Sequence, residues 1–397
     1  MLRASALIDQ AVHSAIGFAL TLTIARQYEV PAFAAYGTAV SVALVAQSFQ
    51  RTGLNIPNAL LDPQSLNQKP GPHLGQYLLF TAISLAALMA CFAVALLIHN
   101  SPAMQLLALS SLVLAVHYFG LEAERVLLFK SGRPIVCAAV SLAQGVLIAA
   151  ALLGVWIAGP PLETMLGALI AISLARTVAV LLIMGRPQFR AGAALVGDSL
   201  RRDLSFSSFG TLATLAIGHG PVFVLGLVSF PAAVAAFVAM RAVFQPLQLV
   251  VRGLDSSSKI LGATGQDELA VRAAMGRELT LNLAVSAAYA ALVLPMAHWI
   301  EQLLFAGKFA DHIVTLYLWA AVMAAMNAAL AVETAVFRLK RVRQYMTCQI
   351  AGGAAAFAAA WPLCSYFADQ GAAIASILGW MVMAMLGWRL TRAGQAS

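Results

Sequence analysis

The chain has 397 residues, of which 61% are hydrophobic and only 10% are charged, and its formal net charge is +8. A soluble domain carries roughly 25% charged residues, so this composition excludes a secreted enzyme or a single-span receptor and predicts an integral membrane protein. The 24 Lys and Arg residues outnumber the 16 Asp and Glu residues. In a membrane protein this excess follows from basic cytoplasmic loops, so we expect no nucleic-acid partner.

Hydropathy and helix-breaking residues predict an all-α protein with twelve membrane-spanning helices, each needing about 20 apolar residues. In chain order the predicted spans are 4–26, 33–56, 74–98, 102–123, 134–158, 163–184, 206–228, 231–256, 278–304, 311–336, 344–367 and 371–390. Several connections are very short, such as His99 to Pro102 and Ser229 to Pro231, so the helices that they join must be antiparallel.

The distribution of basic residues predicts the topology. With the N-terminus in the cytoplasm, only Arg26 and Lys308 fall on the outer side, and Arg176 and Arg241 lie inside helices. All other Lys and Arg residues are then cytoplasmic, so both termini are predicted to be cytoplasmic. The longest interior loop, about 185–205, is basic and is expected to lie on the anionic inner leaflet.

This loop divides the chain into two predicted six-helix lobes, 1–190 and 191–397. The lobes resemble each other in sequence, because Pro31-Ala32 matches Pro231-Ala232 and Gly53-Leu54-Asn55 matches Gly253-Leu254-Asp255. Lobes of six helices share one orientation and are related by an axis along the membrane normal. Such lobes commonly frame a central cavity that opens alternately to each side of the membrane.

Helix 8 carries the most informative polar pattern. One face of this helix holds Arg241, Gln245, Gln248, Arg252 and Asp255. Arg241 lies about ten residues, or roughly 15 Å, from the outer end of the helix, which places it near the midplane. The guanidinium suits phosphate, so this face is predicted to line a polar cavity. The alternative is an arginine that pairs with an acid or carbonyl groups elsewhere in the bundle.

Two further helices carry polar patterns with two interpretations each. In helix 2, Gln47, Arg51 and Asn55 share one face, which either lines the cavity or holds Arg51 as an anchor at the cytoplasmic interface. In helix 1, Asp9 and His13 lie one turn apart. They form either a proton or cation site or a local polar pair that supports the bundle.

Other polar residues also have two interpretations. Arg26 either caps the C-terminus of helix 1 or lines the outer mouth. Arg176 in helix 6 either reaches the cavity or pairs with an acid such as Glu122. The sequence Gly218-His219-Gly220-Pro221 predicts a break in helix 7, with His219 either buried or at a gating hinge. The segment from Glu122 to Arg125 is expected to form local salt bridges.

Enzyme chemistry finds little support in the sequence. It contains no Gly-rich phosphate loop, no paired-His metal motif and no nucleophile elbow, so we expect neither an enzyme nor a bound metal or cofactor. The four cysteines lie in apolar runs and are expected to be small buried hydrophobic residues without a disulfide.

Several segments resemble polysaccharide-unit (Wzx-type) flippases of the MOP superfamily, which also contains the multidrug MATE exporters and the lipid II flippases. The segments are Asp9–Ser14, Ala25–Tyr28, Phe33–Gly37, Glu122–Arg133, Pro231–Ile260 and Leu303–Ala310. The resemblance implies two six-helix lobes in a V shape. It also implies a cavity lined by cationic residues of helices 2 and 8, where Arg51 and Arg241 lie in this sequence.

The resemblance implies transport of a polyprenyl-pyrophosphate-linked oligosaccharide from the inner to the outer leaflet of a bacterial cytoplasmic membrane. In this hypothesis Arg51, Arg241 and Arg252 bind the diphosphate, with Arg176 and Arg26 as further cationic residues. Gln245 and Gln248 contact sugars, and Gln47, Asn55 and Asp255 are further polar residues of the cavity. We expect a monomer that contacts membrane lipids and works with a glycan polymerase or other biosynthesis proteins.

Three alternatives stay open at the level of the sequence. A MATE-type drug exporter needs an acidic cavity for cations, whereas the predicted cavity is basic. A membrane-embedded glycan-processing enzyme usually carries a large outer loop, and the outer loops here are short. A lipid-binding scaffold without transport activity would not need the arginines inside the membrane.

Overall fold

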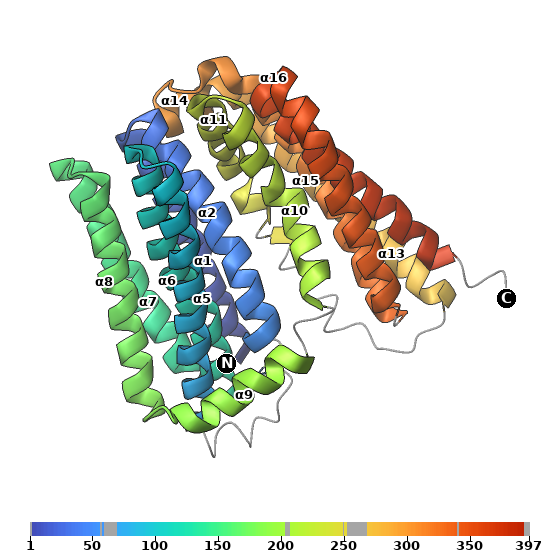
Figure 1. Cartoon of the computed structure of the whole chain (residues 1–397). Coiled ribbons are helices and arrows are strands. Elements are labelled where there is room, and N and C mark those ends of the chain that lie inside the picture. Colours follow the sequence, from blue (N-terminus) through green and yellow to red (C-terminus); the bar gives the residue numbers. More distant parts are fainter. Residues whose placement is uncertain are drawn as a thin grey trace. The chain divides into compact units, whose positions relative to one another are not determined.

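The computed structural model describes residues 2–55, 58, 70–202, 207–248, 250–251, 268–339 and 341–392 (Figure 1). Every regular element in these ranges is helical. The first half contains α1 (Leu2–Gln27), α2 (Val30–Gln50), η1 (Arg51–Asn55), α5 (Pro70–Ile98), α6 (Pro102–Lys130), α7 (Pro134–Ala158), α8 (Leu162–Met184) and α9 (Phe189–Arg202). The second half contains α10 (Ser207–Val228), α11 (Pro231–Val243), α13 (Glu268–Val293), η2 (Leu294–Met296), α14 (Ala297–Phe305), η3 (Ala310–His312), α15 (Ile313–Arg338) and α16 (Val342–Arg392).

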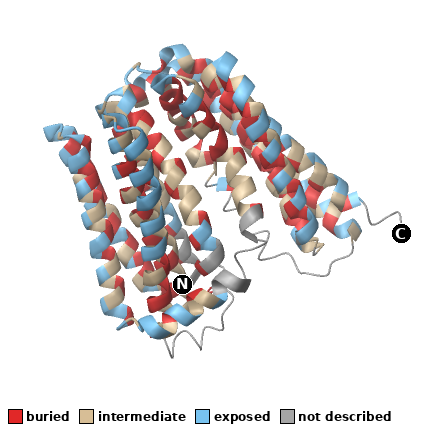
Figure 2. Ribbon diagram, in the orientation of Figure 1, coloured by how far each residue is buried: buried red, intermediate tan, exposed pale blue. Residues whose placement is uncertain are grey.

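These helices are those of a multi-pass membrane protein. Within the described ranges, 10 helical stretches are long and apolar enough to cross a membrane, and α11 is a shorter apolar helix. Exposed residues lie along the outer sides of the helices in both units (Figure 2). Large apolar side chains are exposed on their exteriors, and Leu97, Ile157 and Leu182 are each more than three-quarters exposed. Side chains of this kind belong against lipid. The count of twelve spans and the cytoplasmic location of both termini stay predictions.

Proline and glycine set many of the helix ends. Proline occupies the first turn of α2, α6, α7 and α11, where its missing N–H leaves no hydrogen bond unmade. Ser101 caps α6, since its hydroxyl accepts a hydrogen bond from the Met104 N–H at 3.2 Å. Gly159 ends α7 in the left-handed conformation, at φ 57°. The helix that was expected to end at 123 continues to Lys130, so Glu122, Glu124 and Arg125 lie inside α6.

The long helix α16 consists of two helical stretches that meet at Ala368, whose φ of 47° and ψ of −124° are not helical. Gly371 follows the break and lies against the backbone of Leu363. A Cβ atom at Gly371 would lie 2.0 Å from the Leu363 carbonyl oxygen, so only glycine fits there. This break lies between the two spans predicted at 344–367 and 371–390.

The chain forms two compact units, Met1–Ser208 and Phe209–Ser397. Within the first unit α1 packs on α7, α2 on α6, and α6 on α5 and α8. Within the second unit α11 and α13 pack on α15, and α15 packs on α16. The second helix of each unit therefore packs on the fourth, as does the third. The internal repeat of the sequence stays a prediction.

The segment predicted as a loop over 185–205 instead contains the helix α9, which packs on α5. Gly192 of α9 lies so close to α5 that a Cβ atom there would be 2.4 Å from the Gln76 nitrogen. A Cβ atom at Gly75 would likewise lie 2.4 Å from the Gln188 carbonyl oxygen. Because α9 is held against α5, the first unit extends beyond the predicted boundary at residue 190.

Three of the four cysteines are buried as expected, whereas Cys91 is exposed on α5. Its surroundings on that helix include the exposed apolar side chains of Met89 and Val94. The prediction that Cys91 is buried was therefore wrong, because this face of α5 points away from the rest of its unit.

Candidate functional site

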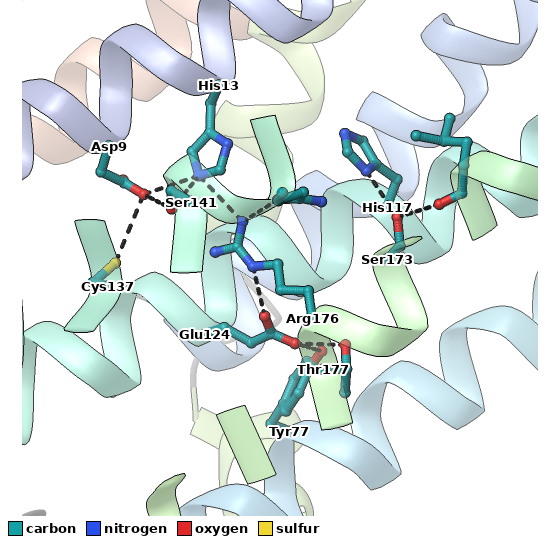
Figure 3. A network of polar contacts seen from close by, with 12 residues as sticks. Asp9, His13, Tyr77, His117, Glu124, Cys137, Ser141, Ser173, Arg176 and Thr177 are labelled. Atoms are coloured by element: carbon teal, nitrogen blue, oxygen red, sulfur yellow. Dashed lines mark hydrogen bonds and ion pairs between the residues drawn. The ribbon is translucent and has the colours of Figure 1, made fainter. Parts of the chain in front are cut away.

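A buried polar network joins five helices of the first unit, α1, α5, α6, α7 and α8, and its side chains point toward one another (Figure 3). Asp9 of α1 is fully buried. Its Oδ1 lies 2.9 Å from the His13 Nε2 and accepts a hydrogen bond from the Ser141 hydroxyl of α7 at 2.5 Å. The predicted contact between Asp9 and His13, one helical turn apart, is therefore present.

The second part of the network is an ion pair between Arg176 of α8 and Glu124 of α6. The Arg176 Nε lies 2.9 Å from the Glu124 Oε2, and both side chains are almost fully buried. The other carboxylate oxygen, Oε1, accepts hydrogen bonds from the Thr177 hydroxyl at 2.6 Å and the Tyr77 hydroxyl at 3.1 Å. Every oxygen of this buried carboxylate is thus satisfied, which is what a charge removed from water requires.

Arg176 also connects the two parts of the network. Its Nη1 donates to the Gln144 side-chain oxygen of α7 and lies 3.4 Å from the His13 Nε2. On the other side Arg125 donates to the Gln10 side-chain oxygen at 2.7 Å and lies 3.5 Å from the Asp9 Oδ2. Two carboxylates and two guanidinium groups therefore balance one another within a single network.

The network has unused hydrogen-bonding capacity. Among the described residues, the His13 Nδ1, the Arg176 Nη2 and the Gln144 Nε2 are buried atoms with no hydrogen-bond partner. Atoms of this kind are suited to an internal water molecule or to a proton that moves through the network.

The acidic residues near the end of helix 4 do not form the local salt bridges expected from the sequence. Glu122 lies 3.3 Å from Arg51 of α2, Glu124 pairs with Arg176, and Arg125 contacts Asp9. Of the two interpretations of Arg176, the structure shows the pairing with an acid, but the acid is Glu124 and not Glu122. Glu122 and Glu124 have different partners because residues two positions apart point to different sides of a helix.

Two of the three polar residues predicted on one face of helix 2, Gln47 and Arg51, contact α6. Gln47 donates to the Tyr118 carbonyl oxygen at 3.1 Å, and Arg51, whose side chain is 61% exposed, pairs with Glu122. Asn55 ends the π-helical turn η1, where its side chain is buried and both of its polar atoms lack a hydrogen-bond partner among the described residues. A π-turn of this kind often marks a functional site.

Arg241 of the second unit lies beside two aromatic rings. Its Nη1 and Nη2 are 3.3 Å from the Nδ1 and Nε2 of His219 on α10, so the guanidinium lies over the imidazole ring. Its Cζ is 5.7 Å from the centre of the Trp319 ring on α15. This arrangement holds a positive charge on the faces of aromatic rings.

The contacts of His219 and Trp319 with Arg241 were not predicted from the sequence. The predicted break at His219 is also wrong, since α10 continues through Pro221 to Val228. The only hint of the contact with His219 in the sequence is that two consecutive apolar helices each contain one basic side chain, His219 in α10 and Arg241 in α11. It could not be read from one helix at a time.

The remaining predicted residues have separate positions. Gln248 donates to the Met323 sulfur at 3.6 Å, and Gln245 is partly buried on the segment after the turn at Phe244, which interrupts the expected helical face. Arg26 lies over the Trp156 ring at 5.3 Å. The predicted residues Arg252 and Asp255, and the repeat match Gly253–Asp255, lie outside the described residues.

Among the described residues no group of three His, Cys, Asp or Glu side chains is placed to hold a metal ion. No protein-family model and no curated protein sequence matches the chain. Known structures do match it over nearly their whole length. An inward-facing multidrug resistance MATE family transporter of the MOP superfamily is similar with a TM-score of 0.66 at 14% identity, over 97% of this chain and 94% of the other.

The chain has the fold of the MATE transporters. The eukaryotic MATE transporter AtDTX14 is similar with a TM-score of 0.62 at 14% identity, over 98% of this chain and 93% of the other. A MOP superfamily transporter from Pyrococcus furiosus, described as having a binding pocket of reverse polarity that suggests a different function, gives 0.57 at 13% identity, over 99% and 94%. The all-helical, MATE-like fold confirms the expected all-α architecture.

Proposed function

We propose that this protein is a MOP-superfamily transporter that flips a polyprenyl-pyrophosphate-linked oligosaccharide from the inner to the outer leaflet by alternating access. The membrane would be a bacterial cytoplasmic membrane, and the role polysaccharide export or cell-envelope biosynthesis. A diphosphate sugar is too polar to cross hydrocarbon unaided. Fixed guanidinium groups can neutralise the phosphates during passage while the prenyl chain stays in lipid.

The observation that carries this proposal is the pairing of three acidic residues of α1 and α6 in the first unit. Asp9 contacts His13 and Arg125, Glu122 contacts Arg51, and Glu124 contacts Arg176. Because these carboxylates are already neutralised, they are poorly suited to bind a cationic drug. An exporter of cations needs acidic groups that its substrate can reach.

The charge of two helices in the second unit also favours an anionic substrate. The helices α10 and α11 together contain one arginine, Arg241, and no acidic residue. Arg241 therefore gives this helix pair a positive charge. A planar guanidinium can present two parallel N–H groups to a phosphate, which favours an anionic substrate over a cationic one.

The MATE-type small-molecule exporter remains the second candidate, because the fold is that of the MATE transporters. A glycan-processing enzyme or a scaffold is less well supported, since the neighbouring structures are transporters. We propose that the protein acts as a monomer together with a glycan polymerase or other biosynthesis proteins.

A direct flipping assay separates the two candidates. The full chain is reconstituted in vesicles that contain a labelled polyprenyl-pyrophosphate-linked oligosaccharide in both leaflets. We expect the inner pool to become accessible to a membrane-impermeant reagent, with no uptake of a cationic dye. Dye uptake without exposure of the glycan would contradict the proposal and support the exporter. Deleting the gene and identifying the accumulated lipid-linked intermediate by mass spectrometry would name the sugar.

Within this function we propose that Asp9 and His13 couple transport to a proton or cation gradient. They share a hydrogen bond and connect through His13 to Arg176, so a change of charge at Asp9 reaches the rest of the network. In vesicles with an imposed gradient, Asp9→Asn is expected to remove the stimulation of transport and to retain the basal rate. The matched variant is Glu122→Gln, at a partly exposed ion pair. If both variants keep the stimulation, Asp9 and His13 are a structural pair only.

A further inference from the structure

One surface of the first unit is not used by the proposed transport function. It lies along α9, which runs crosswise to α5 at the end of the unit where α5 begins (Figure 1). The chain enters this surface at Gly185, whose φ of 103° ends α8. The Gln188 N–H then donates to the Gly71 carbonyl oxygen at 2.9 Å, in the first turn of α5.

The helix α9 is a fixed part of its unit. Gly192 lies against Gly75 and Gln76 of α5, and Val196, one turn further along the same side of α9, is also buried. The backbones of α9 and α5 are so close at Gly75 and Gly192 that no side chain fits between them. A helix held in this way keeps its opposite face in a constant position at one end of the bundle.

That opposite face is exposed, and its basic residues gather where α9 begins. Arg190, Ala194 and Asp198 follow one another at intervals of four residues, and all three are exposed. Arg186 is exposed just before the helix, and the Phe189 ring beside it is 52% exposed. Nearby, Arg133 donates to the Ile183 carbonyl oxygen at the end of α8. Three arginines and one exposed aromatic ring thus lie near the start of α9, whereas the acid of its exposed face, Asp198, lies two turns further along.

We propose that Arg133, Arg186, Phe189 and Arg190, here called the α9 basic surface, bind the headgroups of anionic phospholipids. The depth supports this, because α9 crosses α5 within the first two turns of a membrane-spanning helix. At that depth a crosswise helix lies at the interface between headgroups and acyl chains. Guanidinium groups attract lipid phosphates, and an exposed aromatic ring inserts beside them.

The proposal concerns lipid and does not depend on which substrate is carried. Lipid-free full chain in detergent is titrated separately with short-chain phosphatidylglycerol, short-chain phosphatidylcholine and inorganic phosphate. Native mass spectrometry counts the bound lipid, and the shift in thermal unfolding reports its affinity. We expect retention of phosphatidylglycerol over phosphatidylcholine and no comparable shift with phosphate. An equal effect of phosphatidylcholine or phosphate would overturn the proposal.

A matched pair of double variants tests the location. The variant R186Q/R190Q removes two exposed arginines from the α9 basic surface. The variant R343Q/R389Q removes two exposed arginines from the second unit, which the sequence places on the same side of the membrane. We expect the first variant to weaken phosphatidylglycerol binding roughly 30-fold, since each arginine near a lipid surface contributes about fivefold. If both double variants weakened phosphatidylglycerol binding equally, the lipid would not bind at the α9 basic surface and the proposal would be overturned.

Discussion

Replacing Glu124 with alanine is expected to destabilise the protein by about 3–5 kcal/mol, because the buried Arg176 would lose its carboxylate. The Tyr77 and Thr177 hydroxyl groups would lose their acceptor as well. The midpoint of thermal unfolding in detergent measures the effect. If the pair is structural, the double variant E124M/R176M should recover most of the loss, since an apolar pair leaves no buried charge.

The control for this prediction is Glu122→Ala, two residues away on the same helix. Its partner Arg51 has a side chain that is 61% exposed, so the loss should be about 0–1 kcal/mol. Equal unfolding midpoints for the two single variants would mean that burial does not distinguish the two ion pairs, and the structural assignment of Arg176 would be wrong.

Replacing Arg241 with glutamine is expected to weaken binding of the lipid-linked diphosphate about 10- to 100-fold. Hydrogen bonds to a charged group contribute about 1.5–3 kcal/mol, and each factor of ten corresponds to about 1.4 kcal/mol. Arg241→Lys should be intermediate, because it keeps the charge but loses the planar pair of N–H groups. Binding of a labelled polyprenyl-diphosphate analogue to the purified protein measures both variants.

Arg343→Gln is the control for Arg241, because Arg343 is exposed and takes no part in the proposed site. It should leave the binding of the diphosphate unchanged. Unchanged binding in Arg241→Gln would remove Arg241 from the substrate site. The contacts with His219 and Trp319 would then be a purely structural arrangement.

The position of the helices was largely predictable, because hydropathy and proline are local signals. The helix predicted at 134–158 matches α7, and the break between 367 and 371 coincides with Ala368. The amphipathic segment after residue 185 was recognised as basic and interfacial, but its helix was not. Its docking depends on Gly75 and Gly192, which are distant in sequence and carry no signal until they meet.

The partners of the charged residues were the least predictable part of the site. Asp9 and His13 share one helix, so their contact follows from a spacing of four residues. Arg176 and Glu124 come from different helices, and the sequence could not choose between Glu122 and Glu124. Rotating a helix by one residue, about 100°, changes which neighbour a side chain meets. That rotation is fixed only by packing.

The composition by itself determined that this is a basic, multi-pass membrane protein, because so few charged residues cannot cover a surface in water. The charges left inside the helices also marked Arg176 and Arg241 as residues to explain. Only the tertiary structure decided what they contact: Arg176 is closed into an ion pair with Glu124, whereas Arg241 lies over His219. The free energy of a charge inside a membrane depends on its neighbours, and neighbours come from packing between helices.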